Sequence, residues 1–244
     1  MRIAPGVHRV GTGLVNVYLL DDGGEVTIID AGAPRYWDLL PAELAAMGRS
    51  IEDVRALVLT HAHTDHVGFA ERLRRERHVP VQVHEADAAL ARGEVKPSGQ
   101  QQGPIRIGAI ARFVLFGIRN GLLRIEPIGE VGTFGDGATL EVPGSPRVIA
   151  LPGHSPGSAA LHVPRLDTLF IGDGLATRAV TTGATGARIA PYSSDPAQAL
   201  ASLSRLEGIE AGWVLPGHGE PWVTGVASAV AAVRASAAAS PIGW

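Results

Sequence analysis

The fold of this chain is decided by the segment Thr60-His61-Ala62-His63-Thr64-Asp65-His66. Residues 56–59, Ala-Leu-Val-Leu, precede it and are typical of a buried strand. Three histidines and an aspartate directly after a strand form the imidazole and carboxylate cluster that holds transition-metal ions. The segment therefore predicts a metal site at the carboxyl end of a strand.

The spacing within this segment indicates two adjacent metal positions. His61 and His63 are two residues apart, so in extended backbone they project to the same side. Asp65 and His66 follow after a turn and can reach a second point nearby. Each metal still needs ligands from elsewhere in the chain.

Three later segments repeat the arrangement of a strand followed by a glycine-flanked ligand. His154 lies in Leu151-Pro152-Gly153-His154-Ser155-Pro156-Gly157, Asp173 in Phe170-Ile171-Gly172-Asp173-Gly174, and His218 in Pro216-Gly217-His218-Gly219. Glycine neighbours allow tight turns and close approach to a bound ion. We expect these three side chains to complete the site.

The composition restricts the chemistry further. The 244 residues include nine histidines and no cysteine, so any metal ligand must be histidine, aspartate or glutamate. The net charge of −3 gives no reason to expect a nucleic-acid or membrane partner. No apolar stretch has the length of a signal peptide or a membrane span, so we expect a cytoplasmic protein with a small-molecule substrate.

Short apolar runs alternate with helical patterns along the chain. The expected strands are 15–20, 26–29, 56–59, 81–83, 139–142, 148–151, 159–163, 168–171 and 213–215. The expected helices are 36–47, 69–77, 85–92, 196–206 and 226–239, with Asp195 as the N-cap of the fourth. This order predicts two sheets packed together and covered by helices.

The motifs, in this order, resemble those of the metallo-β-lactamase superfamily of hydrolases. The resemblance implies an α/β fold, a four-layer αββα sandwich, formed by one domain over residues 1–244. It implies that Asp30 supports the metal loop and that Asp173 bridges two ions. The implied ligands are His61, His63 and His154 at the first site, and Asp65, His66 and His218 at the second.

The resemblance also implies a mechanism. Two divalent ions would be the cofactors, zinc by preference for these ligands, with iron or manganese as alternatives. A hydroxide bridging them would attack a carbonyl, and Asp65, the catalytic candidate, would orient it. With an acid at Asp173 and no cysteine, the chain is nearer to the glyoxalase II and lactonase branch than to β-lactamases. The implied substrate is a small ester, lactone or thioester.

Two other activities stay open: a mononuclear iron oxygenase similar to persulfide dioxygenases, and a β-lactam hydrolase. The complete second ligand set favours the dinuclear hydrolase over the oxygenase. Two departures from the resemblance bear on the substrate. Only 26 residues follow His218, which disfavours the glutathione-binding region of glyoxalase II, and residues 175–177 lack the tyrosine typical of lactonases.

Residues 93–130 interrupt the order of strands with an apolar, arginine-dotted segment. We expect a helical insertion that packs on the sandwich, forms a lid over an apolar pocket, or makes a homodimer contact. Phe116 within it, and Tyr192 elsewhere, are the candidate substrate-binding residues. Histidines 8, 78, 84 and 162 match no ligand position and are expected to be surface or structural.

Overall fold

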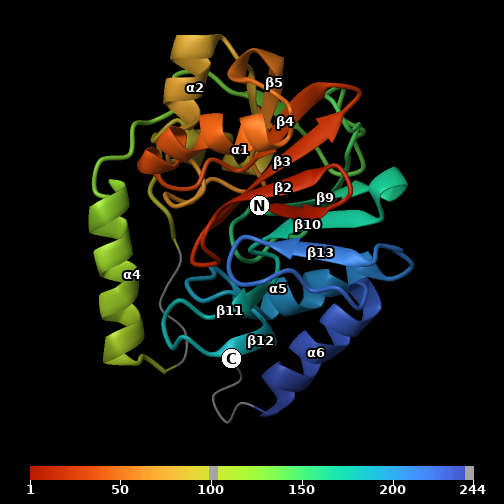
Figure 1. Ribbon diagram of the computed structural model, residues 1–244. Coiled ribbons are helices and arrows are strands. Elements are labelled where there is room, and N and C mark those ends of the chain that lie inside the picture. Colours follow the sequence, from red (N-terminus) through yellow and green to blue (C-terminus); the bar gives the residue numbers. More distant parts are fainter. Residues whose placement is uncertain (99–103, 240–244) are drawn as a thin grey trace.

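A seven-stranded sheet is built mainly by the N-terminal half of the chain. The computed structural model describes residues 1–98 and 104–239, arranged as Figure 1 shows. The strands lie side by side in chain order, antiparallel from β1 to β4 and parallel from β4 to β7. Their bounds are β1 (Arg2–Ala4), β2 (Val7–Gly11), β3 (Asn16–Asp22), β4 (Glu25–Ile29), β5 (Val54–Val58), β6 (Val81–His84) and β7 (Gly132–Phe134).

A second sheet of four strands is built by the C-terminal half, in the order β13-β10-β9-β8. In it, β10 and β13 are parallel, while β9 runs antiparallel to both β8 and β10. A separate pair, β11 and β12, forms a two-stranded sheet. The bounds are β8 (Arg147–Ala150), β9 (Ala159–Val163), β10 (Thr168–Gly172), β11 (Ala176–Arg178), β12 (Thr185–Arg188) and β13 (Trp213–Pro216).

Helices cover the outer face of each sheet, and the expected αββα sandwich is confirmed (Figure 1). The first sheet is covered by α1 (Leu40–Ala46), α2 (Ala70–Arg77) and α3 (Ala88–Ala91). The second is covered by α5 (Pro196–Ser202) and α6 (Val226–Ala239). Each helix buries an apolar stripe against its sheet, as a layered fold requires.

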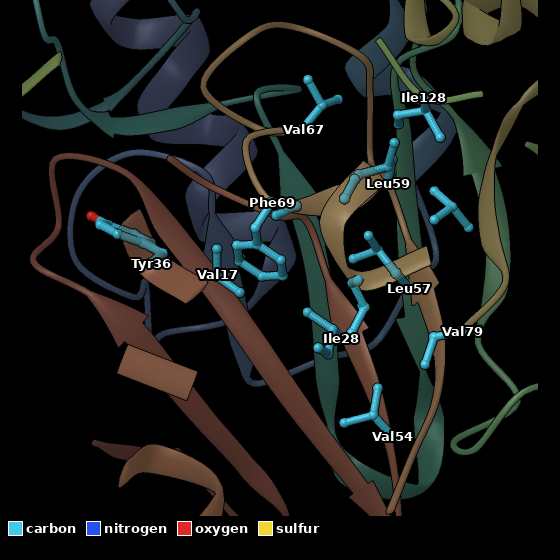
Figure 2. Packing of buried hydrophobic residues seen from close by; sticks show 14 of the residues in the cluster. Val17, Ile28, Tyr36, Val54, Leu57, Leu59, Val67, Phe69, Val79 and Ile128 are labelled. Carbon is cyan, nitrogen blue, oxygen red and sulfur yellow. The ribbon is translucent and has the colours of Figure 1, made fainter. Parts of the chain in front are cut away.

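The strands alternate between two apolar environments. In β3, Val17 and Leu19 pack under the helices, whereas Tyr18 and Leu20 pack between the two sheets. Neighbouring side chains of a strand point to opposite faces, so a central strand of a sandwich must be apolar on both. Figure 2 shows the helix-side cluster, in which the ring of Phe69 lies near Val17.

Four predicted elements differ in the structure. The predicted helix 85–92 is a 3₁₀ helix over Glu85–Asp87 followed by α3, and the predicted helix 196–206 is α5 followed by a 3₁₀ helix over Leu203–Leu206. The predicted helix 36–47 is a 3₁₀ helix over Pro34–Leu39 followed by α1, because Pro41 fits the first turn of a new helix. The predicted strand 139–142 is reduced to a single bridge between Thr139 and Arg147, since Pro143 and Gly144 turn the chain there.

The fourth helix begins as predicted, with the Asp195 carboxylate accepting the Gln198 backbone N–H at 2.9 Å. Among its described residues the insertion contains one further helix, α4 (Ile107–Asn120), which lies along the edge of the molecule (Figure 1). Gly121, with φ of 85°, ends it in the left-handed conformation. None of the helices in the described ranges has the length and apolarity needed to cross a membrane.

Candidate metal centre

The seven predicted ligands, which are far apart in the sequence, lie together at one end of the sandwich. They follow the carboxyl ends of four strands: His61–His66 after β5, His154 after β8, Asp173 after β10, and His218 after β13. Because those ends meet at one edge of the two sheets, the loops converge. Three overlapping groups have ligand atoms within 4.8 Å of one another: His61, His63 and His154; His61, His66 and Asp173; and Asp65, His66 and His218.

The first group is a ring of three imidazoles. The ring centroids of His61 and His63 are 4.8 Å apart, those of His61 and His154 are 4.8 Å apart, and those of His63 and His154 are 4.5 Å apart. Three histidines around one point, with a side open to a cavity, are typical of a catalytic metal position.

Asp173 lies between this ring and the second group. Its Oδ2 atom is 3.4 Å from Nε2 of His154 and 3.2 Å from Nε2 of His218. Its Oδ1 atom is 3.8 Å from Nε2 of His66. Asp65 closes the second group, with Oδ2 at 3.3 Å from Nε2 of His218. One carboxylate therefore faces both groups, as a bridging ligand must.

Four of the histidines are held through Nδ1. His61 faces the Thr60 hydroxyl at 3.1 Å, His66 the Asp30 carboxylate at 3.0 Å, and His154 the Ser193 hydroxyl at 3.1 Å. The fourth, His218, faces the Leu14 carbonyl oxygen. The acceptor on each Nδ1 places the proton there, so Nε2 is left with its lone pair toward the centre.

The inward-facing atoms have the character of metal ligands. The Nε2 atoms of His61, His66 and His154 and the Oδ1 atom of Asp173 are buried without a hydrogen-bond partner among the described residues. Buried polar atoms are nearly always paired, and such a cluster of unpaired ones fits divalent cations. The residues present therefore fit the two-ion site that the sequence predicted.

The pKa values of most of these groups are shifted toward the protonation state that binds a cation. Burial, helped by the neighbouring imidazoles, holds the pKa of His61 well below its usual range. Burial likewise lowers the pKa of His154 to about 3. Burial opposes ionisation of Asp173 and Asp65, yet the surrounding histidines outweigh it and lower the pKa of both carboxyls. Metal ligands must be neutral imidazoles and ionised carboxylates, which is the state that these four groups favour. His66 and His218 differ, because the neighbouring carboxylates outweigh burial and raise the pKa of His66 to about 9 and that of His218 well above its usual range. At these two histidines a cation would take the place of a proton.

The local structure around Asp30 explains how the loop after β5 is held. Asp30 follows β4 in a left-handed conformation, with φ of 62°, which an aspartate tolerates. Its carboxylate accepts the Thr60 backbone N–H at 2.7 Å and the Thr60 hydroxyl at 2.8 Å, besides facing His66. Gly172 is required nearby, because at its φ of 52° a Cβ would collide with the Thr60 side chain. Asp30 thus supports the metal loop, as the resemblance implied.

One organising residue was missed by the sequence analysis. The fully buried carboxylate of Asp87 accepts the backbone N–H of Ala62 at 2.9 Å and that of Gly157 at 2.7 Å. It also accepts the Ser155 hydroxyl at 2.7 Å. Asp87 therefore joins the loop that carries His61 and His63 to the loop that carries His154. A lone aspartate at the start of a helix gives no sequence signal for this role.

A second missed group holds the loop of His218. The Asn16 side-chain amide donates to the carbonyl oxygens of Pro216 at 2.9 Å and of Gly219 at 2.8 Å. The hydroxyl of Tyr18 donates to the Pro216 carbonyl at 2.7 Å. Both residues belong to β3 of the other sheet, so the second metal loop is anchored across the sandwich.

A cavity of about 270 Å³ opens over the ligands. Its floor contains His63, Asp65, His154, Asp173 and His218, and its walls include Phe113, Leu122, Val180, Pro191 and Tyr192. Such a mixture of apolar walls and a polar floor is typical of a small-molecule site. Of the two predicted substrate residues, Tyr192 lines this cavity.

Phe116, the other predicted substrate residue, is not among the lining residues. Its ring packs on Tyr36 with centroids 6.1 Å apart, and burial raises the pKa of Tyr36 to about 12. Phe113, three residues earlier on α4, takes the wall position, with its ring centroid 6.4 Å from that of His218. The sequence identified the helix, but not which of its faces meets the cavity.

The histidines without a predicted ligand role lie elsewhere. His8 contacts Glu43 at 2.6 Å, His162 contacts the Glu210 carbonyl oxygen at 3.0 Å, and His84 caps the turn that leads to Asp87. The exposed His78 ends α2 with φ of 56°.

Comparison with known proteins agrees with this geometry. The chain is 31% identical over 166 residues to the uncharacterized protein YobT of Bacillus subtilis (strain 168), covering 67% of this chain and 63% of YobT. It is 26% identical over 230 residues to the probable metallo-hydrolase YflN of the same organism, covering 89% and 85%. A crystal structure of TTHA1623 in a di-iron-bound form superposes with a TM-score of 0.61 at 27% identity, covering 93% of this chain and 97% of that one.

The family model of the metallo-β-lactamase superfamily matches residues 10–218, a range that contains all seven candidate ligands together with Asp30 and Asp87. The sandwich, the strand-end position of each ligand and this match agree with one another, and the chain belongs to the metallo-β-lactamase superfamily.

Proposed function

We propose that this protein is a hydrolase that holds two adjacent divalent ions, zinc by preference, and cleaves a small ester, lactone or thioester. The position of Asp173 carries the proposal, because its two carboxylate oxygens face His154, His218 and His66 from opposite ligand groups. The second group, Asp65, His66 and His218, is complete beside it, and a site for one ion does not need that group. The name of YflN, a probable metallo-hydrolase, supports the same general activity.

The ions, when bound, supply a water of lowered pKa and polarise the carbonyl oxygen of the substrate. The chain supplies position and charge. Asp65 lines the cavity beside His218. Burial raises the pKa of the Asp65 carboxyl, but His66 and His218 outweigh burial and lower it, so the group is ionised. Its Oδ2 atom therefore accepts a hydrogen bond from the attacking water and orients it. Fixed groups of this kind need no rearrangement during the reaction.

The walls of the cavity select the substrate. Phe113, Leu122 and Val180 form an apolar wall opposite the ligand floor, which suits the hydrocarbon part of an acyl group or lactone. The volume of about 270 Å³ fits a small substrate, with the scissile carbonyl at the floor and the acyl chain along α4.

Metal analysis and activity assays together test the proposal. Elemental analysis of the purified protein is expected to give two divalent ions per chain, and anaerobic assays with lactones, aryl esters and thioesters are expected to show turnover. His61→Ala is expected to lose the ion of the first group and the activity, whereas the control His78→Asn retains both. Two ions in His61→Ala would refute the ligand assignment.

The same metal analysis, with assays of oxygen uptake and of a chromogenic cephalosporin added, separates the alternatives. The di-iron form of TTHA1623 makes iron the first metal to compare with zinc. If the protein contains one iron per chain and consumes oxygen, the assignment changes from a hydrolase to an oxygenase. Turnover confined to a chromogenic cephalosporin would assign β-lactams in place of the proposed substrates.

A further inference from the structure

The inner face of α4 packs on the protein. Phe113, with Leu122 just after the helix, walls the cavity, and Phe116 packs on Tyr36. Gly117 is buried on the same side, and the Arg106 backbone N–H donates to the Thr181 carbonyl oxygen at 3.0 Å. The helix is therefore fixed to the sandwich along one side.

The outer face of α4 is also apolar, and it is exposed. Ile107, Ala111, Val114 and Ile118 follow one another at intervals of three or four residues, so they form a continuous ridge along the helix. Ile107 is 86% exposed, Val114 52% and Ile118 56%. Leu115, also exposed, lies beside this ridge. A helix that is apolar on both sides is normally covered on both sides.

The charge around the outer ridge is of one sign. Residues 95–125 contain no acidic residue. Their basic residues are Lys96, Arg106, Arg112, Arg119 and Arg124. The rest of the chain has 16 basic and 24 acidic residues. The net charge of −3 is therefore the sum of a basic segment and an acidic remainder. Arg112 and Arg119, both exposed, lie seven residues apart along one edge of the ridge.

We propose that the outer ridge of α4 docks on an anionic lipid surface, with the helix lying in the plane of the headgroups. A helix with aliphatic side chains on its free face and arginines along the edge has the composition of interfacial membrane helices. The aliphatic side chains would enter the acyl boundary, and Arg112 and Arg119 would contact lipid phosphates.

Other occupants fit the ridge less well. A second copy of the chain, packed antiparallel through α4, would bring Arg112 and Arg119 against the same arginines with no acid in the segment to pair with them. Surfaces that bind a protein partner usually carry tryptophan or tyrosine side chains as anchors, and residues 93–130 contain neither. No membrane partner was expected from the sequence, because the net charge of the whole chain is negative. That sum does not show that the positive charges are concentrated in residues 95–125.

Vesicle co-sedimentation of the full chain tests the proposal without relying on its enzymatic activity. The protein is expected to bind vesicles of phosphatidylcholine mixed with phosphatidylglycerol, to bind phosphatidylcholine alone much more weakly, and to be released by salt. Arg112→Gln and Arg119→Gln are each expected to weaken binding by about fivefold. Combined Ile107→Ser, Val114→Ser and Ile118→Ser are expected to weaken it by at least about tenfold.

Matched controls change the same residue types away from α4. Val223→Ser, at a position 57% exposed, and Arg147→Gln, on the exposed end of β8, are expected to bind as the parent does. Melting temperatures of all variants verify that they are folded. Binding that is absent, or equal on both kinds of vesicle, would overturn the proposal. A change from dimer to monomer in the serine variant, without vesicle binding by the parent, would assign the ridge to a second copy instead.

Discussion

Replacing Asp87 with alanine tests whether one buried carboxylate holds the two loops of the candidate metal centre in register. Its Oδ2 atom accepts the Ala62 N–H, and its Oδ1 atom accepts the Gly157 N–H. The side chain is fully buried, so water does not replace it. The substitution should therefore affect both the stability of the fold and the relative placement of His61, His63 and His154.

The magnitude follows from the groups left behind. The Ser155 hydroxyl retains Ser158 Oγ at 2.9 Å as a partner, but the amides of Ala62 and Gly157 lose theirs. A buried donor without a partner costs about 1–3 kcal/mol, so the two amides together should lower the free energy of unfolding by about 4 kcal/mol. For a chain of this size the melting temperature should fall by roughly 10 °C. Asp87→Asn should lose less, because its amide oxygen still accepts one of the two N–H groups.

The assay combines thermal unfolding with a metal competition against a chromophoric chelator, both at a temperature where the variant is folded. Loss of a residue that orients metal ligands typically costs about 10- to 100-fold in metal affinity, and that range is expected here. Asp136→Ala is the matched control, since Asp136 also accepts a backbone N–H, that of Ala150, but is 46% exposed. The control should lose about 1 kcal/mol or less and keep its metal affinity. Full stability or unchanged metal affinity in Asp87→Ala would refute the reasoning.

Four further substitutions test other parts of the structure. Asp173→Asn should leave at least one ion position weakly loaded and reduce hydrolysis strongly; full metal content with normal turnover would contradict the bridging role. Phe113→Ala should change the preference for acyl length in a substrate panel, whereas Phe116→Ala should mainly destabilise the fold, by about 2 kcal/mol. Glu71→Gln should lower the free energy of unfolding by about 1–2 kcal/mol at neutral pH, because the bidentate bond from Arg74, at 2.8 and 2.9 Å, lowers the pKa of Glu71. Since that pKa is lowered in the fold, the contribution is present above the unfolded value of 4.5 and is lost as the pH falls below it, so parent and variant should converge in acid. A difference that persists unchanged in acid would show that Glu71 acts through packing.

The sequence predicted the elements that follow from local patterns. Alternating apolar runs located β3, β4, β9 and β10, and the Asp195-Pro196 pair located the start of α5. The ligand positions were predictable for the same reason: a histidine or aspartate directly after a buried strand, flanked by glycine, is visible within one short segment. The fold then placed all seven in one cluster.

The remainder depends on contacts between distant residues. Asp87 meets Gly157 across 70 positions of the chain, and Asn16 meets Pro216 across 200, so neither role leaves a local pattern. Phe113 and Phe116 are equally apolar, and only the tertiary packing of α4 decides which one faces the cavity. The short β7 was missed because its three residues, Gly-Thr-Phe, become a strand only by pairing with β6.

The division of the ligands between the two halves of the chain has a consequence for the protein during its synthesis. The first ligand loop leaves the ribosome with the N-terminal half, and His154, Asp173 and His218 follow with the C-terminal half. A nascent chain therefore carries an incomplete set of ligands until the second sheet has formed and docked. The candidate metal centre comes into being only with the finished sandwich.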